Sequence, residues 1–167
     1  MKIESPDHTY IINSISDNVN AGHKDEVKIF LAGTIDNGDS NNWQHEMIEY
    51  INDSFDANNI IVFNPRCNYW PDNENDIVHQ IEWEQKKLDE ADYIFMNLEP
   101  NSKSPISLLE LGLYAQSKKL YVFCDRHFYR FANVRLTCDK YDIPLFTNCT
   151  TIQSKANTLI RILTHTL

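Results

Sequence analysis

Short apolar runs alternate along the chain with longer segments in which apolar residues recur at helical spacing. Each of five short runs predicts a strand: residues 27–32, 60–63, 93–96, 120–124 and, more weakly, 143–146. The periodic segments between and after them predict helices: residues 43–55, 77–91, 105–117, 133–141 and 152–166. This alternation predicts an α/β fold, with an open, mostly parallel five-stranded sheet and helices on both faces, as in flavodoxin-like and Rossmann-like proteins.

The first 26 residues do not share this regular pattern. They are polar apart from the run Tyr10-Ile11-Ile12, which predicts a lone strand or one arm of a hairpin packed on the domain. We therefore expect residues 1–26 to form an extension, as loop or hairpin, and residues 27–167 to form a single domain, which suits the length of the chain.

The chain is acidic, with a formal net charge of -9 and an isoelectric point of about 5.0. It therefore has no general attraction for nucleic acid polymers or anionic membranes. A nucleotide-sized ligand remains possible, because backbone N–H groups can hold a phosphate locally. No apolar leader and no run of 18 apolar residues is present, so we expect a cytoplasmic protein without a membrane partner.

The spacing of cysteine and histidine argues against metal chemistry. None of the four cysteines forms a C-x-x-C pair, and the six histidines are scattered with no H-x-x-x-H pair. We therefore expect free thiols in a reducing compartment, no metal site and no cofactor.

Parallel open sheets bind ligands at the carboxyl ends of their strands. Four segments would lie at that edge: residues 33–37, 64–70, 97–104 and 125–130. One further polar residue, Glu110, lies among Leu108, Leu109 and Leu111, in the helix after the third of these strands. A carboxylate in apolar surroundings is costly unless it has a function or a partner, although an exposed position on the outer helix face is the plainer interpretation.

Other candidates carry weaker signals. Glu84 lies on the preceding helix among other acidic residues, so a solvated charged face also accounts for it. Ser104 precedes Pro105 and suits a helix N-cap. Gly33 permits close backbone approach at the end of the first strand, but a lone glycine turn is not a dinucleotide or phosphate-loop motif.

Taken together, several segments in this order resemble the nucleoside 2-deoxyribosyltransferase family, and in particular its transferase-like branch related to deoxynucleoside monophosphate glycosidases. The most specific is Glu110-Leu111-Gly112 with Ala115 after it. The resemblance covers about residues 28–147 and rests on these segments: Phe30 to Asp36, Asn64-Pro65-Arg66, Trp83-Glu84, Ala91-Asp92, Ser104 to Ala115, and Asn133-Val134.

The resemblance implies roles for two acidic residues. Glu110 matches the family's nucleophile, which attacks the anomeric carbon of the sugar and expels the base. Glu84 matches a second acid that positions or protonates the departing base, although family members usually carry Asp at this position. No cofactor is implied.

The resemblance also implies a set of ligand-binding residues: Gly33, Thr34, Ile35, Asp36, Asn64, Arg66, Ser104 and Asn133. Ser104 replaces the Asp with which free-nucleoside transferases grip the sugar, and resembles the Ser that helps hold a 5′-phosphate in the monophosphate glycosidases. Asp36 replaces an Arg of those glycosidases and would repel a phosphate. Arg66 or Arg130 could supply the missing positive charge.

Asn133 matches a position that reaches into a neighbouring subunit's site, which implies a homodimer or larger homo-oligomer with shared sites. An ordinary helix N-cap also accounts for it.

The expected activity is transfer or hydrolysis of the N-glycosidic bond of a 2′-deoxynucleoside or its 5′-monophosphate. Two alternatives stay open: an NAD glycohydrolase, and a binding module that senses a nucleotide without turnover. The sequence leaves the choice between transferase and hydrolase open, and also the base, for which Trp43, Tyr69 and Trp70 are candidate stacking partners.

Overall fold

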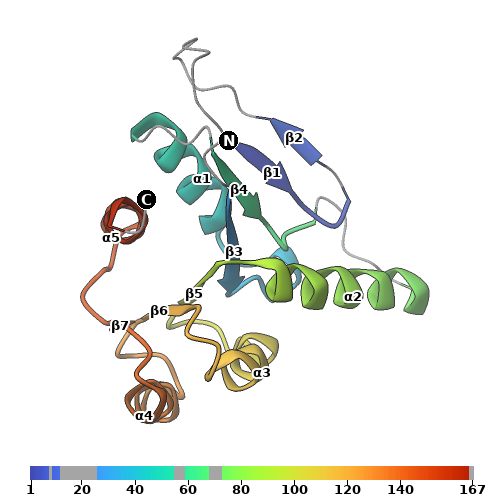
Figure 1. Ribbon diagram of the computed structural model, residues 1–167. Coiled ribbons are helices and arrows are strands. Elements are labelled where there is room, and N and C mark those ends of the chain that lie inside the picture. Colours follow the sequence, from blue (N-terminus) through green and yellow to red (C-terminus); the bar gives the residue numbers. More distant parts are fainter. Residues whose placement is uncertain (8, 12–25, 55–58, 68–72, 166–167) are drawn as a thin grey trace.

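The protein is an open α/β structure built on one sheet (Figure 1). The computed structural model describes residues 1–7, 9–11, 26–54, 59–67 and 73–165, without the side chains of residues 9–11 and 37. The strands are β1 (Lys2–Glu4), β2 (Thr9–Ile11), β3 (Val27–Gly33), β4 (Ile60–Phe63), β5 (Tyr93–Leu98), β6 (Leu120–Cys124) and β7 (Leu145–Phe146). The helices are α1 (Trp43–Ser54), α2 (Glu74–Glu90), α3 (Pro105–Tyr114), α4 (Phe131–Tyr141) and α5 (Ile152–Thr164), and Asp36–Gly38 forms a short 3-10 turn.

The strands follow the order β2-β1-β4-β3-β5-β6-β7, and all pairs are parallel except the edge pair β1–β2. The predicted fold class is confirmed, and the sheet is larger than the five strands expected. The two additional strands come from the polar segment before residue 26. Ile3 is the only apolar side chain of the three-residue β1, and it is fully buried, so this strand is too short for a periodic pattern to reveal.

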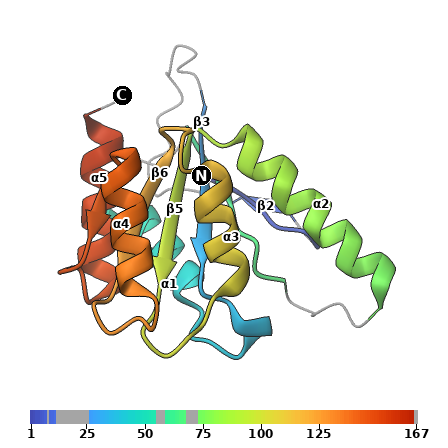
Figure 2. The same ribbon diagram turned by 90° about the horizontal axis from the view of Figure 1, so that it is seen from below.

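Helices cover both faces of the sheet (Figure 2). α1 and α5 lie on one face, and α2, α3 and α4 lie on the other. Because all four residues of β4 are buried, this strand carries no polar face, as expected for a parallel strand between two helical layers. Among the described residues, the helices are all too short or too polar to cross a membrane.

The helix boundaries follow from capping residues. α2 begins three residues earlier than its apolar pattern predicts, because the side chain of Asn73 accepts a hydrogen bond from the backbone N–H of Asp76 at 3.0 Å. Thr151 caps α5 in the same way through Ser154. Such caps satisfy N–H groups that have no partner within the helix.

The start of the chain is joined to α2 through Glu4. The carboxylate of Glu4 lies 2.8 Å from Nζ of Lys87 on α2, and the carbonyl of Glu4 accepts a hydrogen bond from the backbone N–H of Asn64. Lys87 also lies over the ring of Phe63, 4.5 Å from its centroid. β1 is therefore connected both to the end of β4 and to the helix that follows it.

The ends of β3 and β5 approach each other closely at Gly33. Gly33 has φ of 128°, a conformation that favours glycine, and a Cβ at this position would lie 2.6 Å from the backbone nitrogen of Asn97 and overlap its carbonyl group. The next residue, Thr34, donates its backbone N–H to the carbonyl of Asn97 at 2.8 Å. Only glycine allows this contact.

We expect Gly33→Ala to lower the free energy of unfolding by at least about 2 kcal/mol, because the strained backbone and the overlap with Asn97 must be relieved together. Gly112→Ala is the matched control, since a Cβ there meets nothing within 4 Å and alanine favours a helix by up to about 1 kcal/mol. Urea denaturation measures both, and equal stabilities of the two variants would contradict the role assigned to Gly33.

Candidate active site

The predicted site segments gather where β3 and β5 end and α3 begins. Gly33 ends β3, Asn97 lies next to last in β5, and the two are register partners. The loop after β5 leads through Ser102 and Ser104 into α3. Figure 2 shows these ends at one edge of the sheet, as expected for a ligand site in a parallel open sheet.

Glu110 of α3 and Glu84 of α2 are two half-buried carboxyl groups that interact electrostatically. Burial, and to a smaller extent the negative charge of Glu84, raises the pKa of Glu110 to about 8. Burial also raises the pKa of Glu84, opposed by a hydrogen bond of 2.9 Å from Nε2 of Gln80 to Oε1 of Glu84. Two like charges in a desolvated space are unfavourable together, so the pair retains a proton near neutral pH.

A second α2–α3 contact lies one turn beyond the carboxyl pair. The hydroxyl of Tyr114 on α3 donates to Oδ1 of Asp89 on α2 at 2.7 Å. The negative charge of Glu110 helps to raise the pKa of Tyr114, after burial and the hydrogen bond with Asp89. Glu110 therefore lies on the side of α3 that faces α2, not on its outer face, and the exposed position considered from sequence does not hold.

A continuous chain of hydrogen bonds crosses the loop between β3 and α3. The backbone N–H of Glu99 donates to Oγ1 of Thr34 at 3.0 Å, and Thr34 Oγ1 lies 2.8 Å from Oγ of Ser104. Ser104 Oγ lies 2.8 Å from Oγ of Ser102, which donates to Oδ1 of Asp36 at 2.7 Å. The side chains of Thr34, Ser102 and Ser104 are thereby linked to the carboxylate of Asp36.

Ser104 occupies the N-cap position of α3, but its side chain does not cap the helix. Its backbone is left-handed, with φ of 42° and ψ of 53°, a conformation that costs about 1–2 kcal/mol for a residue other than glycine. Such strain is often found at functional sites. The hydroxyl of Ser104 is thus available to the chain just described, and capping does not account for it.

Arg66 holds the loop that follows β3 through hydrogen bonds. All three of its guanidinium nitrogens donate within the protein: Nε to Oε1 of Gln44, Nη1 to the carbonyl of Gly38, and Nη2 to the hydroxyl of Ser40 at 2.8 Å and to nearby carbonyls. Burial lowers the pKa of Arg66, opposed by the charges of Glu99 and Asp36. In this arrangement the guanidinium stabilises the loop after β3, and a role of Arg66 in ligand binding stays a prediction.

Three further predicted residues serve the same framework. The side chain of Asn64 accepts from the backbone N–H of Arg66 at 3.1 Å, and the carbonyl of Ile35 accepts from the hydroxyl of Ser40 at 2.9 Å. Trp43 is buried, and its indole N–H donates to the carbonyl of Thr34 at 2.8 Å. The other two candidate stacking residues, Tyr69 and Trp70, lie outside the described residues.

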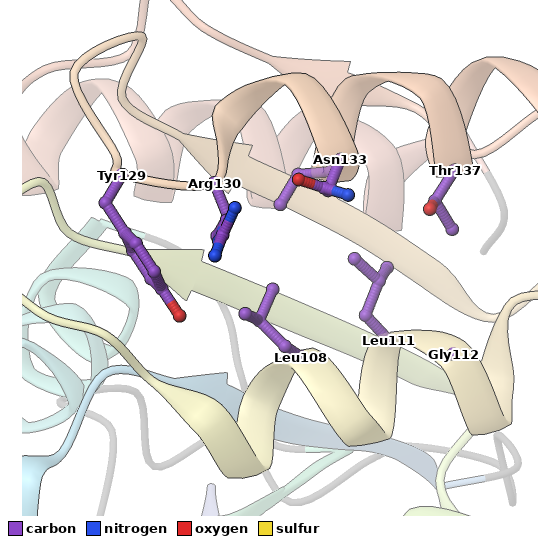
Figure 3. A pocket seen from close by; sticks show the side chains of 8 residues that line it. Leu108, Leu111, Gly112, Tyr129, Arg130, Asn133 and Thr137 are labelled. Carbon is purple, nitrogen blue, oxygen red and sulfur yellow. The ribbon is translucent and has the colours of Figure 1, made fainter.

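Asn133 and Arg130 lie on the other side of α3. They line a cavity of about 290 Å³ between α3 and α4, together with Leu108, Leu111 and Tyr129 (Figure 3). Arg130 lies over the ring of Tyr129, 5.3 Å from its centroid. Within one chain, the structure therefore brings Glu110 together with Glu84 on α2, and places Asn133 in a separate cavity.

Two residues of this arrangement were not singled out from the sequence. Ser102 connects Ser104 to Asp36, and the only signal for it is a second serine two residues before the N-cap. Gln80 holds Glu84 from one helical turn away, and its signal is the four-residue spacing on a helix.

The fold and the carboxyl pair define a class of protein: an open α/β domain with two desolvated acids beside the carboxyl edge of its sheet. A family model described as nucleoside 2-deoxyribosyltransferase like matches residues 26–128, more than half of the chain. The chain therefore belongs to this family, which implies a small nucleoside-type ligand. The matched range contains both Glu84 and Glu110 and ends before Asn133. A comparison with curated proteins finds no match.

The raised pKa of Glu110 predicts how stability changes with pH. Its folded pKa of about 8 lies above the ordinary value of 4.5, so the folded state binds this proton more tightly than the unfolded state does. Stability contributed by this group is complete below the ordinary pKa and declines as the pH rises toward the folded pKa.

We expect Glu110→Gln to remove this decline and to be more stable than the wild type by at least about 1 kcal/mol at about pH 8. Urea unfolding at about pH 5 and about pH 8 measures it. Glu82→Gln is the control, because Glu82 is exposed on α2. If Glu110→Gln and Glu82→Gln show the same pH dependence, Glu110 is not desolvated.

Proposed function

We propose that the protein transfers or hydrolyses the N-glycosidic bond of a 2′-deoxynucleoside or its 5′-monophosphate through a covalent sugar ester on Glu110. The observation that carries this proposal is the half-buried, electrostatically coupled pair of Glu110 and Glu84, contributed by adjacent helices beside the ligand edge of the sheet. Such a pair supplies both a nucleophile and an acid. Family membership supports the substrate class.

The proton shared by the pair serves the first step. Glu110, with its pKa raised to about 8, holds the proton at rest, and transfer of that proton to Glu84 leaves Glu110 as a carboxylate. The carboxylate oxygen forms a bond to C1′ of the sugar while the bond from C1′ to the base nitrogen breaks. Glu84 gives the proton to the departing base, which leaves neutral, and Glu84 becomes ionised.

The second step reverses these movements with a new acceptor. Ionised Glu84 removes a proton from an incoming base or from water, and the acceptor attacks C1′ as the ester bond to Glu110 breaks. Two inversions at C1′ give net retention, as in retaining glycosidases. A base as acceptor gives transfer, and water gives hydrolysis.

The same arrangement is compatible with cleavage of the ribosyl–nicotinamide bond of NAD, because the bond broken is again an N-glycosidic bond. Nicotinamide already leaves as a neutral base from a cationic substrate, so the reaction would not need an acid. The elevated pKa of Glu84 beside Glu110 therefore favours a substrate whose base must be protonated.

The test is release or exchange of the base from each deoxynucleoside, each deoxynucleoside monophosphate and NAD, with and without free adenine. We expect Glu110→Gln to lower the rate by at least about 1,000-fold and Glu84→Gln by about 100- to 10,000-fold. Glu82→Gln, the same change at an exposed position of α2, should leave the rate unchanged. The mass of acid-quenched protein should increase by the sugar only when Glu110 is present.

A substrate with a cationic base separates the two acids. N7-methylated deoxyguanosine leaves without a proton, so it should restore activity to Glu84→Gln and not to Glu110→Gln. Activity that survives Glu110→Gln would overturn the mechanism. Absence of all turnover, with a nucleotide that raises the melting temperature, would support a binding module in its place.

We also propose that the protein is a homodimer or larger homo-oligomer with shared sites. The outer face of α3 carries Ile106, Leu109 and Leu113, each with more than half of its surface exposed. Adjacent to it, Tyr129 in the loop before α4 and Leu136 on α4 are also exposed. Contiguous apolar side chains of this kind commonly mark contacts between proteins, and a second copy seated there would place its own residues beside the cavity of Asn133.

We expect the double change Leu109→Lys and Leu113→Lys to reduce the oligomer to monomers, because two charges would be buried without partners at the contact. Sedimentation velocity measures the mass of the particle. Ile81→Lys is the matched control, an exposed apolar residue on α2, and it should leave the oligomer intact. A monomeric wild type would contradict the proposal.

A further inference from the structure

The chain of hydroxyl groups between β3 and α3 has a direction, because its two ends are fixed. At one end the backbone N–H of Glu99 can only donate, and it donates to Oγ1 of Thr34. At the other end the carboxylate of Asp36 can only accept, and it accepts from Ser102. A hydroxyl group has one proton to donate, so the bonds between these ends must follow one direction.

The order of protons then follows link by link. Ser102 has given its proton to Asp36, so in the 2.8 Å contact between Ser102 and Ser104 the donor is Ser104. Ser102 also accepts from the backbone N–H of Ser104 at 3.0 Å. Since Ser104 has given its proton to Ser102, the donor in the 2.8 Å contact between Thr34 and Ser104 is Thr34.

Ser104 therefore has no proton left for a ligand. Its oxygen accepts from Thr34 and donates to Ser102, which leaves it only a further lone pair. Thr34, Ser102 and Ser104 are all buried. If one link of the chain were reversed, a buried hydroxyl group would lack a hydrogen-bond partner, and water could not replace that partner as it does for an exposed group. A ligand group that contacts Ser104 must consequently be a hydrogen-bond donor.

We infer that Asp36, acting through Ser102, is a specificity-determining residue. It makes Ser104 a hydrogen-bond acceptor, which favours the free 5′-hydroxyl of a deoxynucleoside and disfavours a 5′-phosphate. This inference rests on the proposed function, which places C1′ beside Glu110. Ser104 is the N-cap of α3 and lies six residues before Glu110, roughly 9 Å along the helix axis. A deoxynucleoside whose C1′ contacts the carboxylate of Glu110 would span this separation if its 5′ group extended toward Ser104. A phosphate offers only acceptor oxygens and a negative charge, and it would meet an oxygen lone pair and the carboxylate of Asp36.

The substitution Asp36→Asn tests the direction of the chain. An asparagine amide can turn its N–H₂ group toward Ser102, which would then accept from residue 36 and release the proton of Ser104 for a ligand. The backbone of Asp36 is left-handed, with φ of 50°, and asparagine tolerates this conformation well. Asp39→Asn is the matched control, because it removes one negative charge from the same exposed loop without entering the chain.

The readout is the ratio of dissociation constants for a deoxynucleoside and its 5′-monophosphate, measured by calorimetry on Glu110→Gln protein so that no turnover interferes. We expect the nucleoside to bind at least about 10-fold more tightly than the monophosphate. A 5′-O-methyl deoxynucleoside, which has an acceptor but no charge, should also bind about 10-fold more weakly than the nucleoside. Asp36→Asn should reduce both ratios by about 10-fold, and Asp39→Asn should change neither.

Ser102→Ala provides a second variant that keeps the charge of Asp36 while freeing the proton of Ser104, and it should weaken the discrimination against the 5′-O-methyl compound. Tighter binding of the monophosphate by the otherwise unchanged protein, or equal effects of Asp36→Asn and Asp39→Asn, would overturn the inference. Because binding is measured without turnover, an inactive wild type that shows the expected ratios would refute the proposed reaction and leave this inference standing.

Discussion

At Gly33 the backbones of β3 and β5 come closer than any side chain would allow, and the order of the candidate site follows from that contact. The approach lets Thr34 bond to Asn97 through its backbone and to the N–H of Glu99 through its side chain. Thr34 in turn contacts Ser104, the residue from which α3 begins. The start of α3, and with it Glu110, is thus held in place relative to the sheet by hydrogen bonds as well as by apolar packing.

Burial of two carboxyl groups is the second constraint, and it works against stability. A protein gains nothing in folding from placing Glu110 and Glu84 where burial raises both pKa values, because each ionised form loses hydration that the unfolded chain would provide. The cost is lowered by the hydrogen bond from Gln80 to Glu84 and by retention of a proton. An arrangement that is unfavourable for folding and suited to proton transfer is what a catalytic role would require.

Much of the fold could be predicted from the sequence, because apolar runs such as 60–63 and 120–124 can be buried only as strands between two helical layers. β1 could not, since a three-residue strand with one apolar side chain has no period. Glu110 and Glu84 were found through a resemblance of several segments in order. The left-handed backbone of Ser104 and the link through Ser102 could not be found, because neither residue type requires that conformation or that partner.

The connection of β1 to α2 links the first residues of the chain to the helix that carries Glu84 of the candidate site. Lys87, which pairs with Glu4, lies three residues from Glu84 on the same helix, and Glu4 lies before the range that the family model matches. The helix that carries Glu84 is thus held in part by a contact from outside the segment that the family model matches. Under the proposed mechanism, related chains that differ in this short strand would share every residue of the candidate site and still differ in how readily the base departs.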